Sequence, residues 1–325
     1  MDDLDLLVLG DCNPDLVLRG PDLHPRFGQA EQPVDEARLA IGGSGAITAC
    51  GAARLGLRTA LVGVVGDDVL GHWLLEELAG RGVDVGGCVV DRVRPTGMTV
   101  VLSEPGDRAM FTAVGTVAAL RAEQIDPDLR RAARHLHVSS YYLQNALRPS
   151  LAGLFRKARL DGRSTSLDPN WDPAEAWDTG LGALLPHTDC LLPNGEEAVR
   201  IAAVVARAGT GGVEAAATAL AAAGPLVVVK LGPAGAVAAA PDRRGPVVRA
   251  SVPSMAAAVE DTTGAGDSFD AGFLFGHLSG WPLERALALA CACGTLSTRG
   301  LSGTAAQPTL EEAMQALGAP PLRPW

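Results

Sequence analysis

Short apolar runs alternate along this chain with longer alanine-rich stretches. The run Leu4–Leu9 and the run at 226–229 have the length and composition of strands that are buried on both faces. The stretch after residue 43 and the one at about 283–295 instead carry small and apolar residues at helical spacing. Strands that alternate with helices favour a mostly parallel sheet covered by helices on both sides, so the pattern predicts an α/β fold.

Two segments depart from this alternation. The segment 16–39 is polar and interrupted by prolines, and Asn13-Pro14-Asp15 before it predicts a turn after the first strand. The segment 92–117 has two stretches of strand-like alternation around a Pro-Gly turn at 104–107, which is typical of a hairpin. No repeat, low-complexity linker or domain boundary interrupts the sequence, and we expect one α/β domain over 1–325.

Charge and composition exclude several classes of partner. The formal net charge is −10, and no run of Lys or Arg is long enough to follow a phosphate backbone, so nucleic acid and anionic membranes are not expected partners. No uncharged apolar stretch reaches the roughly 20 residues of a spanning helix. The chain enters a strand almost at once with acidic flanks, which speaks against a signal peptide.

Six cysteines in 325 residues do not form a disulfide framework. Cys291 and Cys293 are two residues apart on a predicted helix and point in different directions, which is the wrong spacing for zinc. We expect small core residues and a cytoplasmic location, where thiols stay reduced.

The string DTTGAGDSFDAG at 261–272 carries the clearest chemistry. Gly264, Ala265 and Gly266 leave backbone N–H groups unshielded where a loop enters a helix, and such groups attract phosphate oxygens. Asp267 follows in the first helical turn, where a carboxylate can accept a proton from an attacking hydroxyl. An isolated turn of this kind can also be an ordinary helix start, with the Asp as a dipole partner.

The full string resembles the C-terminal signature of the ribokinase/PfkB family of sugar and nucleoside kinases. The resemblance implies ATP and Mg²⁺ as cofactors, Asp267 as the catalytic base and the amides of Gly264–Gly266 as the anion hole. It implies a ribokinase-like three-layer α/β/α fold with a mostly parallel central sheet. It also implies a small β lid from about 13–40 and 92–117, which excludes water from the sugar and often pairs two subunits into a homodimer.

The N-terminal region also resembles this family. Gly42 and Gly43 match its sugar-binding glycine pair, although Ile47 stands where members often carry an Asn that reads a sugar hydroxyl. Asp15 matches a carboxylate that binds substrate hydroxyls, and charge-assisted hydrogen bonds would suit it to a polyol. A carboxylate at this place can also serve only to close the turn.

Further motifs match the family's nucleotide and metal sites. Asn194 and Glu197 match its N-x-x-E element, which organises Mg²⁺ through water, although NGEEA is also a good helix start. Gly232 and Gly235 match its nucleotide loop, where Lys230 replaces the usual Thr. This lysine can add a charge near the phosphates or lie along the surface as a solvated side chain.

Two more residues of the site are implied by position in the family. Cys291 would face the adenine from the predicted helix at 283–295. Asp261 and the carbonyl of Thr263 would begin a monovalent-cation site, normally for K⁺, that the loop 299–304 completes. Asp261 can equally be a plain turn carboxylate.

The acceptor is the least determined part of the prediction. LDPNWDP at 167–173 resembles the D-x-N-x-R strand end of ketodeoxygluconate kinases, but Trp171 and Asp172 occupy the region of the Arg that would meet an acidic sugar. Arg108 in the hairpin is then the one obvious cation for an acidic group. A neutral sugar or polyol is therefore our first expectation.

Other functions remain open at this point. A nucleoside could pack its base against Ile47, Met110 and Phe111. A non-catalytic sugar- or nucleotide-binding protein would need a broken base or anion hole, and Asp267 and its turn are intact. A dinucleotide-dependent dehydrogenase would need G-x-G-x-x-G after the first strand, which Gly10-Asp11-Cys12-Asn13 does not supply.

Overall fold

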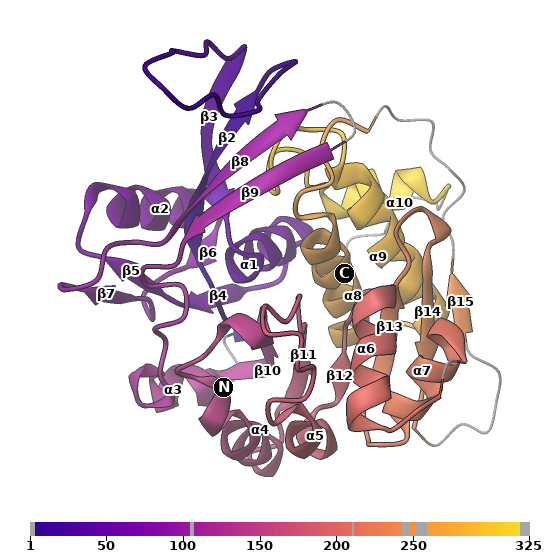
Figure 1. Cartoon of the computed structure of the whole chain (residues 1–325). Helices are drawn as coiled ribbons and strands as arrows, with labels where there is room; N and C mark the ends of the chain where they lie inside the picture. Colours follow the sequence, from indigo (N-terminus) through magenta and orange to yellow (C-terminus); the bar gives the residue numbers. More distant parts are fainter. Residues whose placement is uncertain (1–3, 105–106, 210, 242–247, 251–258, 319–325) are drawn as a thin grey trace.

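The computed structural model describes residues 4–104, 107–209, 211–241, 248–250 and 259–318. Its largest element is a nine-stranded sheet with the strand order β15-β14-β13-β12-β11-β10-β1-β4-β6 (Figure 1). The strands of this sheet are β1 Leu4–Leu9, β4 Thr59–Val62, β6 Val83–Asp84, β10 Ala133–Val138, β11 Ser164–Leu167, β12 Cys190–Leu191, β13 Leu226–Lys230, β14 Ala236–Ala239 and β15 Val248–Ala250.

The strands from β6 to β13 run parallel, and only β14 and β15 at one edge pair antiparallel. The chain starts in the middle with β1, builds β4 and β6 on one side, and then returns to build β10 to β13 on the other side. The strand order therefore reverses between β1 and β10. In open α/β sheets, ligands bind beyond the carboxyl ends of the strands at such a reversal.

Helices cover both faces of this sheet. One layer holds α1 Ser44–Leu55, α2 Val69–Gly80, α8 Ala265–Leu278, α9 Leu283–Ser297 and α10 Leu310–Ala316. The other layer holds α3 Pro127–Ala132, α4 Leu151–Leu160, α5 Leu181–Leu184, α6 Gly195–Val205 and α7 Gly212–Ala221. Strand β1 shows the alternation that two layers require, because Leu6 and Val8 pack in one core while Leu7 and Leu9 pack in the other. The predicted three-layer α/β/α fold is confirmed.

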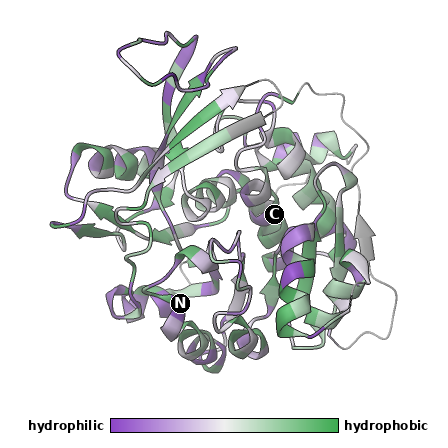
Figure 2. Ribbon diagram, viewed as in Figure 1, coloured by the Kyte–Doolittle hydropathy of each residue, from purple (hydrophilic) through white to green (hydrophobic). Residues whose placement is uncertain are grey.

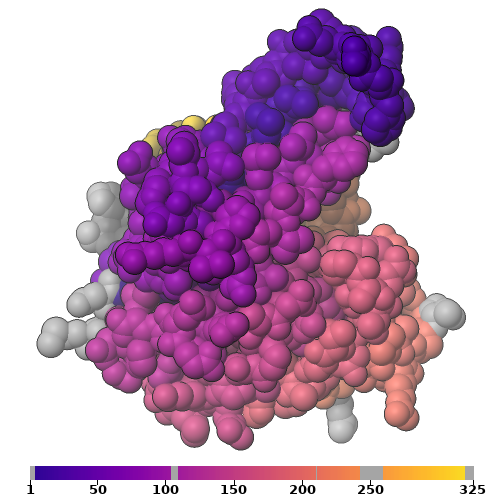
Figure 3. Space-filling model, turned by 60° about the vertical axis from the view of Figure 1, so that its left-hand side comes forward, coloured from indigo at the N-terminus to yellow at the C-terminus, as the bar shows by residue number. Residues whose placement is uncertain are grey.

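A second sheet of four strands has the order β3-β2-β8-β9, from β2 Asn13–Arg19, β3 Glu36–Gly42, β8 Met98–Glu104 and β9 Asp107–Ala113. It stands out from the body of the molecule in the space-filling view (Figure 3). A third, two-stranded sheet pairs β5 Val64–Gly66 with β7 Val89–Asp91. No helix in the described ranges is long and apolar enough to cross a bilayer.

The predicted turn at Asn13-Pro14-Asp15 is wrong, because these residues begin strand β2. Pro14 faces Ile41 of β3, while the ladder to β8 begins only at Asp15, opposite Thr99. The proline therefore removes no donor from the pairing with β8, which is how a strand start tolerates it.

Helix α8 starts from a turn that only glycine fits. Gly264 precedes the helix with φ 71°, a left-handed conformation. A Cβ on this residue would lie 2.6 Å from Cα of Gly303 and 3.0 Å from Cγ2 of Ile47. The glycine pair 264 and 303 therefore lets two loops touch, and Ile47 packs beneath them.

We predict that Gly264→Ala lowers the free energy of unfolding by about 2 kcal/mol or more. The left-handed backbone alone costs about 1–2 kcal/mol for an L-residue, and the clash with Gly303 adds to it. Chemical denaturation measures the loss. Gly280→Ala is the matched control, because Gly280 has φ 69° with no neighbouring atom within 4 Å of its Cβ position. Equal losses in the two variants would show that the contact with Gly303 contributes nothing.

Candidate active site

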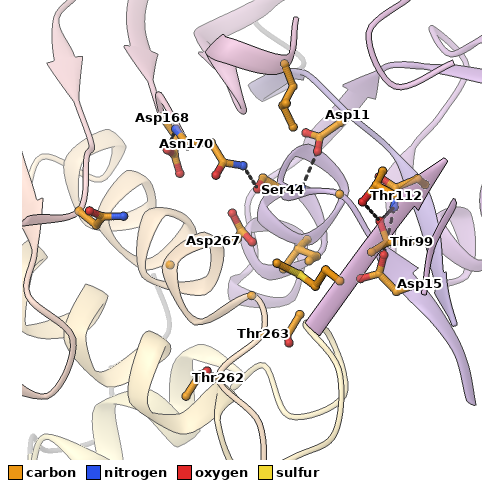
Figure 4. Close-up of a pocket in the computed structure, with 18 of the residues that line it drawn as sticks. Asp11, Asp15, Ser44, Thr99, Thr112, Asp168, Asn170, Thr262, Thr263 and Asp267 are labelled. Atoms are coloured by element: carbon orange, nitrogen blue, oxygen red, sulfur yellow. Dashed lines mark hydrogen bonds between the residues drawn. The ribbon is translucent and has the colours of Figure 1, made fainter. Parts of the chain in front are cut away.

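A cavity of about 500 Å³ lies beyond the carboxyl ends of the parallel strands, between the large sheet and the second sheet (Figure 4). Residues from both ends of the chain meet there. The predicted site residues that line it are Asp15, Gly43, Ile47, Asn194, Glu197, Lys230, Gly232, Thr263, Gly264, Gly266 and Asp267.

The glycine turn before α8 presents its donors to this cavity. Gly264 and Gly266 line it, and no acceptor in the described part of the chain takes their N–H groups. The N–H of Ala265 instead donates to the carbonyl of Thr262 at 3.3 Å, and Ala265 is not among the lining residues. In this conformation the turn therefore offers an anion two glycine amides at the positive end of a helix rather than three consecutive ones.

Asp267 lies in the first turn of α8 and is 8% exposed, on the side that faces the cavity. Burial and the neighbouring carboxylate of Asp168 raise its pKa to about 8, although Lys230 opposes the shift. The hydroxyl of Ser44, at the start of α1, favours the charged form of this carboxyl group and so lowers its pKa. Figure 4 shows the two side chains close together. A carboxyl group with a pKa this close to neutrality can take up a proton, as a general base must.

The opposite end of the cavity is built from the second sheet. The amide nitrogen of Asn13 donates to the carboxylate of Asp15 at 3.0 Å, and the hydroxyls of Thr99 and Thr112 lie 3.1 Å apart on β8 and β9. Burial and the carboxylate of Asp11 raise the pKa of Asp15 to about 7. Closely spaced carboxylate, amide and hydroxyl groups form a surface for a molecule with several hydroxyl groups.

Gly42 is required by Asp15 and not by a ligand. A Cβ on Gly42 would fall 2.0 Å from Oδ1 of Asp15, which lies diagonally across on β2, so the carboxylate occupies the space of the missing side chain. Gly43, with φ 83°, lines the cavity and passes close to the carbonyl of Asp11. Only the second glycine of the pair faces the site.

Several lining residues were missed by the sequence analysis. Asp11 follows β1 and accepts the N–H groups of Ser44 and Gly45 at 3.1 Å each, at the positive end of α1. Asp168 and Asn170 follow β11 in the same way. The position of Asp11, Asp168 and Asn170 just after a strand is the sequence feature that could have identified them as lining residues. Asn13, Thr99 and Thr112 face the cavity only because strands pair across the second sheet, and Val117 reaches it from the turn after β9.

Asn194 and Glu197 form a capping box at the start of α6. Asn194 Oδ1 accepts the N–H of Glu197 at 3.0 Å, and Glu197 Oε2 accepts the N–H of Asn194 at 2.8 Å. Both residues also line the cavity, and burial raises the pKa of Glu197 to about 7. The two residues therefore start the helix, as one of the two interpretations expected, and they also face the cavity. No group of three or more His, Cys, Asp or Glu in the described ranges is placed to hold a metal ion.

Lys230 does not lie along the surface. Its side chain is 12% exposed, and its ammonium group contacts the carboxylates of Asp168 at 2.9 Å and Asp270 at 3.0 Å. These carboxylates raise its pKa, although burial opposes them. The charged end lies inside the protein at the edge of the cavity.

Asp261, Gly235 and Cys291 are not among the residues that line the cavity. Asp261 accepts the N–H of Thr263 at 2.8 Å and the N–H of Ser302 at 2.9 Å, and so ties the loop before α8 to the loop after α9. Cys291 is a nearly buried residue of α9, and Gly235 follows a short 3₁₀ turn. Arg108 belongs to β9, but its side chain lies outside the described part.

Trp171 and Asp172 have structural partners next to the site. The Arg200 guanidinium stacks 4.9 Å from the ring centroid of Trp171 and 5.5 Å from that of Trp177. Asp172 accepts the N–H groups of Ala174 at 2.9 Å and of Trp177 at 2.8 Å. These interactions stabilise the loop after β11.

Comparisons with known proteins agree with this geometry. The sequence profile of the pfkB family carbohydrate kinases matches residues 3–310. The chain is 31% identical to an ATP-dependent ribose-1-phosphate kinase of Halopiger xanaduensis, over 94% of this chain and 95% of the relative. It is 32% identical to a fructokinase of Klebsiella pneumoniae, over 95% and 98%.

Solved structures show the same fold. The ribokinase of Arabidopsis thaliana, complexed with ribose and ATP, has a TM-score of 0.77 at 25% identity, over 97% of this chain and 98% of that chain. The adenosine kinase of Sinorhizobium meliloti has a TM-score of 0.81 at 24% identity, over 96% and 98%. The family predicted from the DTTGAGDSFDAG string is confirmed, and a dehydrogenase is excluded. The chain belongs to the pfkB family of carbohydrate kinases and is a phosphotransferase with an alcohol group as acceptor.

Proposed function

We propose that this chain transfers the γ-phosphoryl group of ATP to a hydroxymethyl group of a small neutral sugar or polyol. One observation carries the proposal: Asp267, the glycine turn before it and the hydroxyl-binding groups around Asp15 all line one cavity. A base, an anion-binding turn and a polyol site within one cavity are what phosphoryl transfer to an alcohol requires.

In the proposed reaction the acceptor binds by its hydroxyl groups to Asp15 and Asn13. Its hydroxymethyl group then lies at Asp267, which takes the proton as the oxygen attacks the γ-phosphorus in line. The N–H groups of Gly264 and Gly266 hold the phosphoryl oxygens as negative charge develops on them. A single donor of this kind is worth about 3 kcal/mol of transition-state stabilisation in other enzymes, so this turn can supply much of the acceleration.

The nucleotide would bind on the other side of the glycine turn. Asn194, Lys230 and Gly232 line that part of the cavity, and we expect Gly235 and Cys291 to extend it toward the adenine. Glu197 fits Mg²⁺ held through water, because Mg²⁺ prefers oxygen ligands and keeps several waters. When bound, Mg²⁺ would neutralise charge on the phosphates. A monovalent cation at Asp261 and Thr263 stays a prediction, tested by replacing K⁺ with Na⁺ in the assay.

A neutral acceptor suits the charges at the sugar end. Asp11 and Asp15 both face that end, and Lys230, the one cation among the lining residues, is already paired with two carboxylates. An anionic sugar would therefore meet repulsion unless Arg108 offsets it. A nucleoside is the second candidate, because Met110 lines the cavity beside Ile47 and can pack a base.

We expect the second sheet, with the segments 13–40 and 92–117, to act as a lid over the acceptor in a one-domain kinase. Leu39 and Phe111 on this sheet are 37% and 59% exposed and do not line the cavity, and Figure 2 shows the hydrophobic colour along β8 and β9. Exposed apolar residues on one sheet are typical of an interaction surface, which favours a homodimer through the lid. The cytoplasmic location stays a prediction from the free cysteines.

We predict that Asp267→Asn keeps the fold and ATP binding but lowers turnover to below a few per cent, because the amide cannot accept the proton. A coupled ATP assay over pentoses, hexoses, polyols, sugar acids and nucleosides first finds the acceptor, and the variant is then measured with it. Thermal melting with ATP checks folding and nucleotide binding. Turnover well above this level would remove Asp267 from the role of base.

We predict that kcat/KM for the acceptor rises with pH and levels off at around pH 8. The pKa of Asp267 is raised to about 8, so the carboxylate that accepts the proton is lost as pH falls below that value. A pH–rate profile with saturating ATP measures this fall in kcat/KM toward low pH, here called the acid limb of the profile. A profile that is flat between pH 6 and 9 would contradict the assignment.

We predict that Asp15→Asn raises KM for the acceptor by about tenfold to a hundredfold and leaves KM for ATP nearly unchanged. Hydrogen bonds to a charged group contribute about 1.5–3 kcal/mol, and the amide replaces one acceptor by a donor. Initial rates with each substrate varied in turn separate the two constants. A change confined to KM for ATP would place Asp15 outside the acceptor site.

A further inference from the structure

Lys230, Asp168 and Asp270 form a buried group of three ionisable side chains, here called the lysine triad. Asp270 is fully buried and Asp168 is 5% exposed. The lysine Nζ lies 2.9 Å from Oδ2 of Asp168, and 3.2 and 3.0 Å from the two carboxylate oxygens of Asp270. The proposed reaction assigns no role to either aspartate.

The triad lies directly behind the reacting groups. Lys230 ends β13, Asp168 follows β11, and Asp270 lies on α8 three residues after Asp267, on the same side of the helix. The lysine Nζ is 3.7 Å from the position that a Cβ on Gly266 would take. One ammonium group therefore connects two strand ends with the helix turn that carries both the base and the anion-binding amides.

The sequence shows that lysine is an unusual choice here. Of the 27 Lys and Arg residues in the chain, only those at 157 and 230 are lysines. A compact ammonium group with three donors can serve two carboxylates at one point, whereas the planar guanidinium group needs more room. Buried ion pairs are weak contributors to stability and are often replaceable by apolar side chains, which points to a role other than holding the fold together.

We propose that the lysine triad is a positioning and charge-balancing device that keeps the carboxylate of Asp267 available as the base. The inference rests on the proposed role of Asp267 and adds Lys230, Asp168 and Asp270 as positioning residues for it. Lys230 supplies the positive charge that offsets the acidic groups around the base, and Asp270 limits that effect by sharing the ammonium group.

The groups that face Asp267 explain why one cation matters. Asp11 faces it from the end of β1 and Asp168 from the end of β11, and both oppose its ionisation. Lys230 and the Ser44 hydroxyl favour ionisation. Asp270 lies on the same helix: burial and the neighbouring Asp168 oppose its ionisation, and the ammonium group of Lys230, 3.0 Å from its Oδ2, favours it. The outer groups His137 of β10 and Glu197 of α6 interact with Asp168 and Lys230 and not directly with the base.

Lys230→Met tests the device, because methionine has a similar shape without the charge. We expect the acid limb of kcat/KM to move to higher pH by about one unit or more, the size of effect that a nearby opposite charge has on a carboxyl group. At a pH below the limb this is a loss of about tenfold or more, and it should recover at high pH. Lys157→Met is the matched control, since Lys157 is exposed on α4 and its loss should leave the profile unchanged.

Asp270→Asn gives a shift of opposite sign. Removing the competing carboxylate frees the charge of Lys230 for Asp267, so the acid limb should move to lower pH. The double variant Lys230→Met with Asp270→Asn removes one charge of each sign, and its limb should return toward that of the unchanged protein. Lys230→Arg should restore the limb position even where its larger side chain lowers kcat. Thermal melting confirms that each variant is folded before its profile is taken.

The outcomes separate this inference from the proposed function. The inference would be overturned if Lys230→Met and Asp270→Asn lost activity equally at every pH while the acid limb of the profile stayed at the same pH. A purely structural role of the triad predicts that result. A raised KM for ATP with an unmoved limb would also overturn the inference, because Lys230 would then act on the nucleotide alone. If Asp267→Asn retains turnover, the proposed base itself fails, whatever the triad variants do.

Discussion

The close contact between two glycine-containing loops at the start of α8 is the constraint on which the site depends. Gly264 can take its left-handed conformation beside Gly303 only because neither carries a side chain, and Ile47 fills the space below them. This contact fixes where the helix begins and therefore where its unpaired N–H groups point. Asp267 follows three residues after Gly264, so the same backbone turn also fixes the distance between the proposed base and the amides proposed to bind the phosphoryl group. A shift of this turn would move both together, which couples fold and chemistry at one place.

The fold and the family could be predicted from the sequence because both depend on short-range patterns. Apolar runs such as Leu4–Leu9 predict strands by their length, and the string at 261–272 contains the turn, the helix start and the base within twelve residues. The sugar end of the cavity depends on long-range pairing instead. Thr99 and Thr112 face the cavity because β8 pairs with β2 and β9, a register that no local pattern specifies. The Asn13-Pro14-Asp15 error has the same origin, since strand pairing overrides the turn preference of these residues.

Lys230 shows a different limit of sequence reasoning. The position after an apolar strand leaves open whether Lys230 lies near the phosphates or along the surface, because its counter-ions come from β11 and α8, far away in the chain. Asp270 belongs to the family-like string and yet has no chemical role that the string itself suggests. Asp168 and Asp270 are connected only in the structure, where both carboxyl groups contact the ammonium group of Lys230. Residues that act in pairs from distant elements are therefore visible in the structure and hidden in the sequence, even where each lies in a motif.

The acidity of the cavity has consequences for both substrates. Asp11, Asp15, Asp168, Glu197 and Asp267 line it, and ATP brings further negative charge into the same space. In the proposed reaction, the glycine amides offset the charge of the transferred group, a divalent cation would offset that of the other phosphate oxygens, and Lys230 offsets the carboxylates behind the turn. A neutral acceptor adds nothing to this balance, whereas an anionic acceptor needs a cation of its own. The charge arrangement proposed to keep Asp267 reactive is therefore also the reason for proposing an uncharged polyol as acceptor, because both follow from the scarcity of positive groups among the described lining residues.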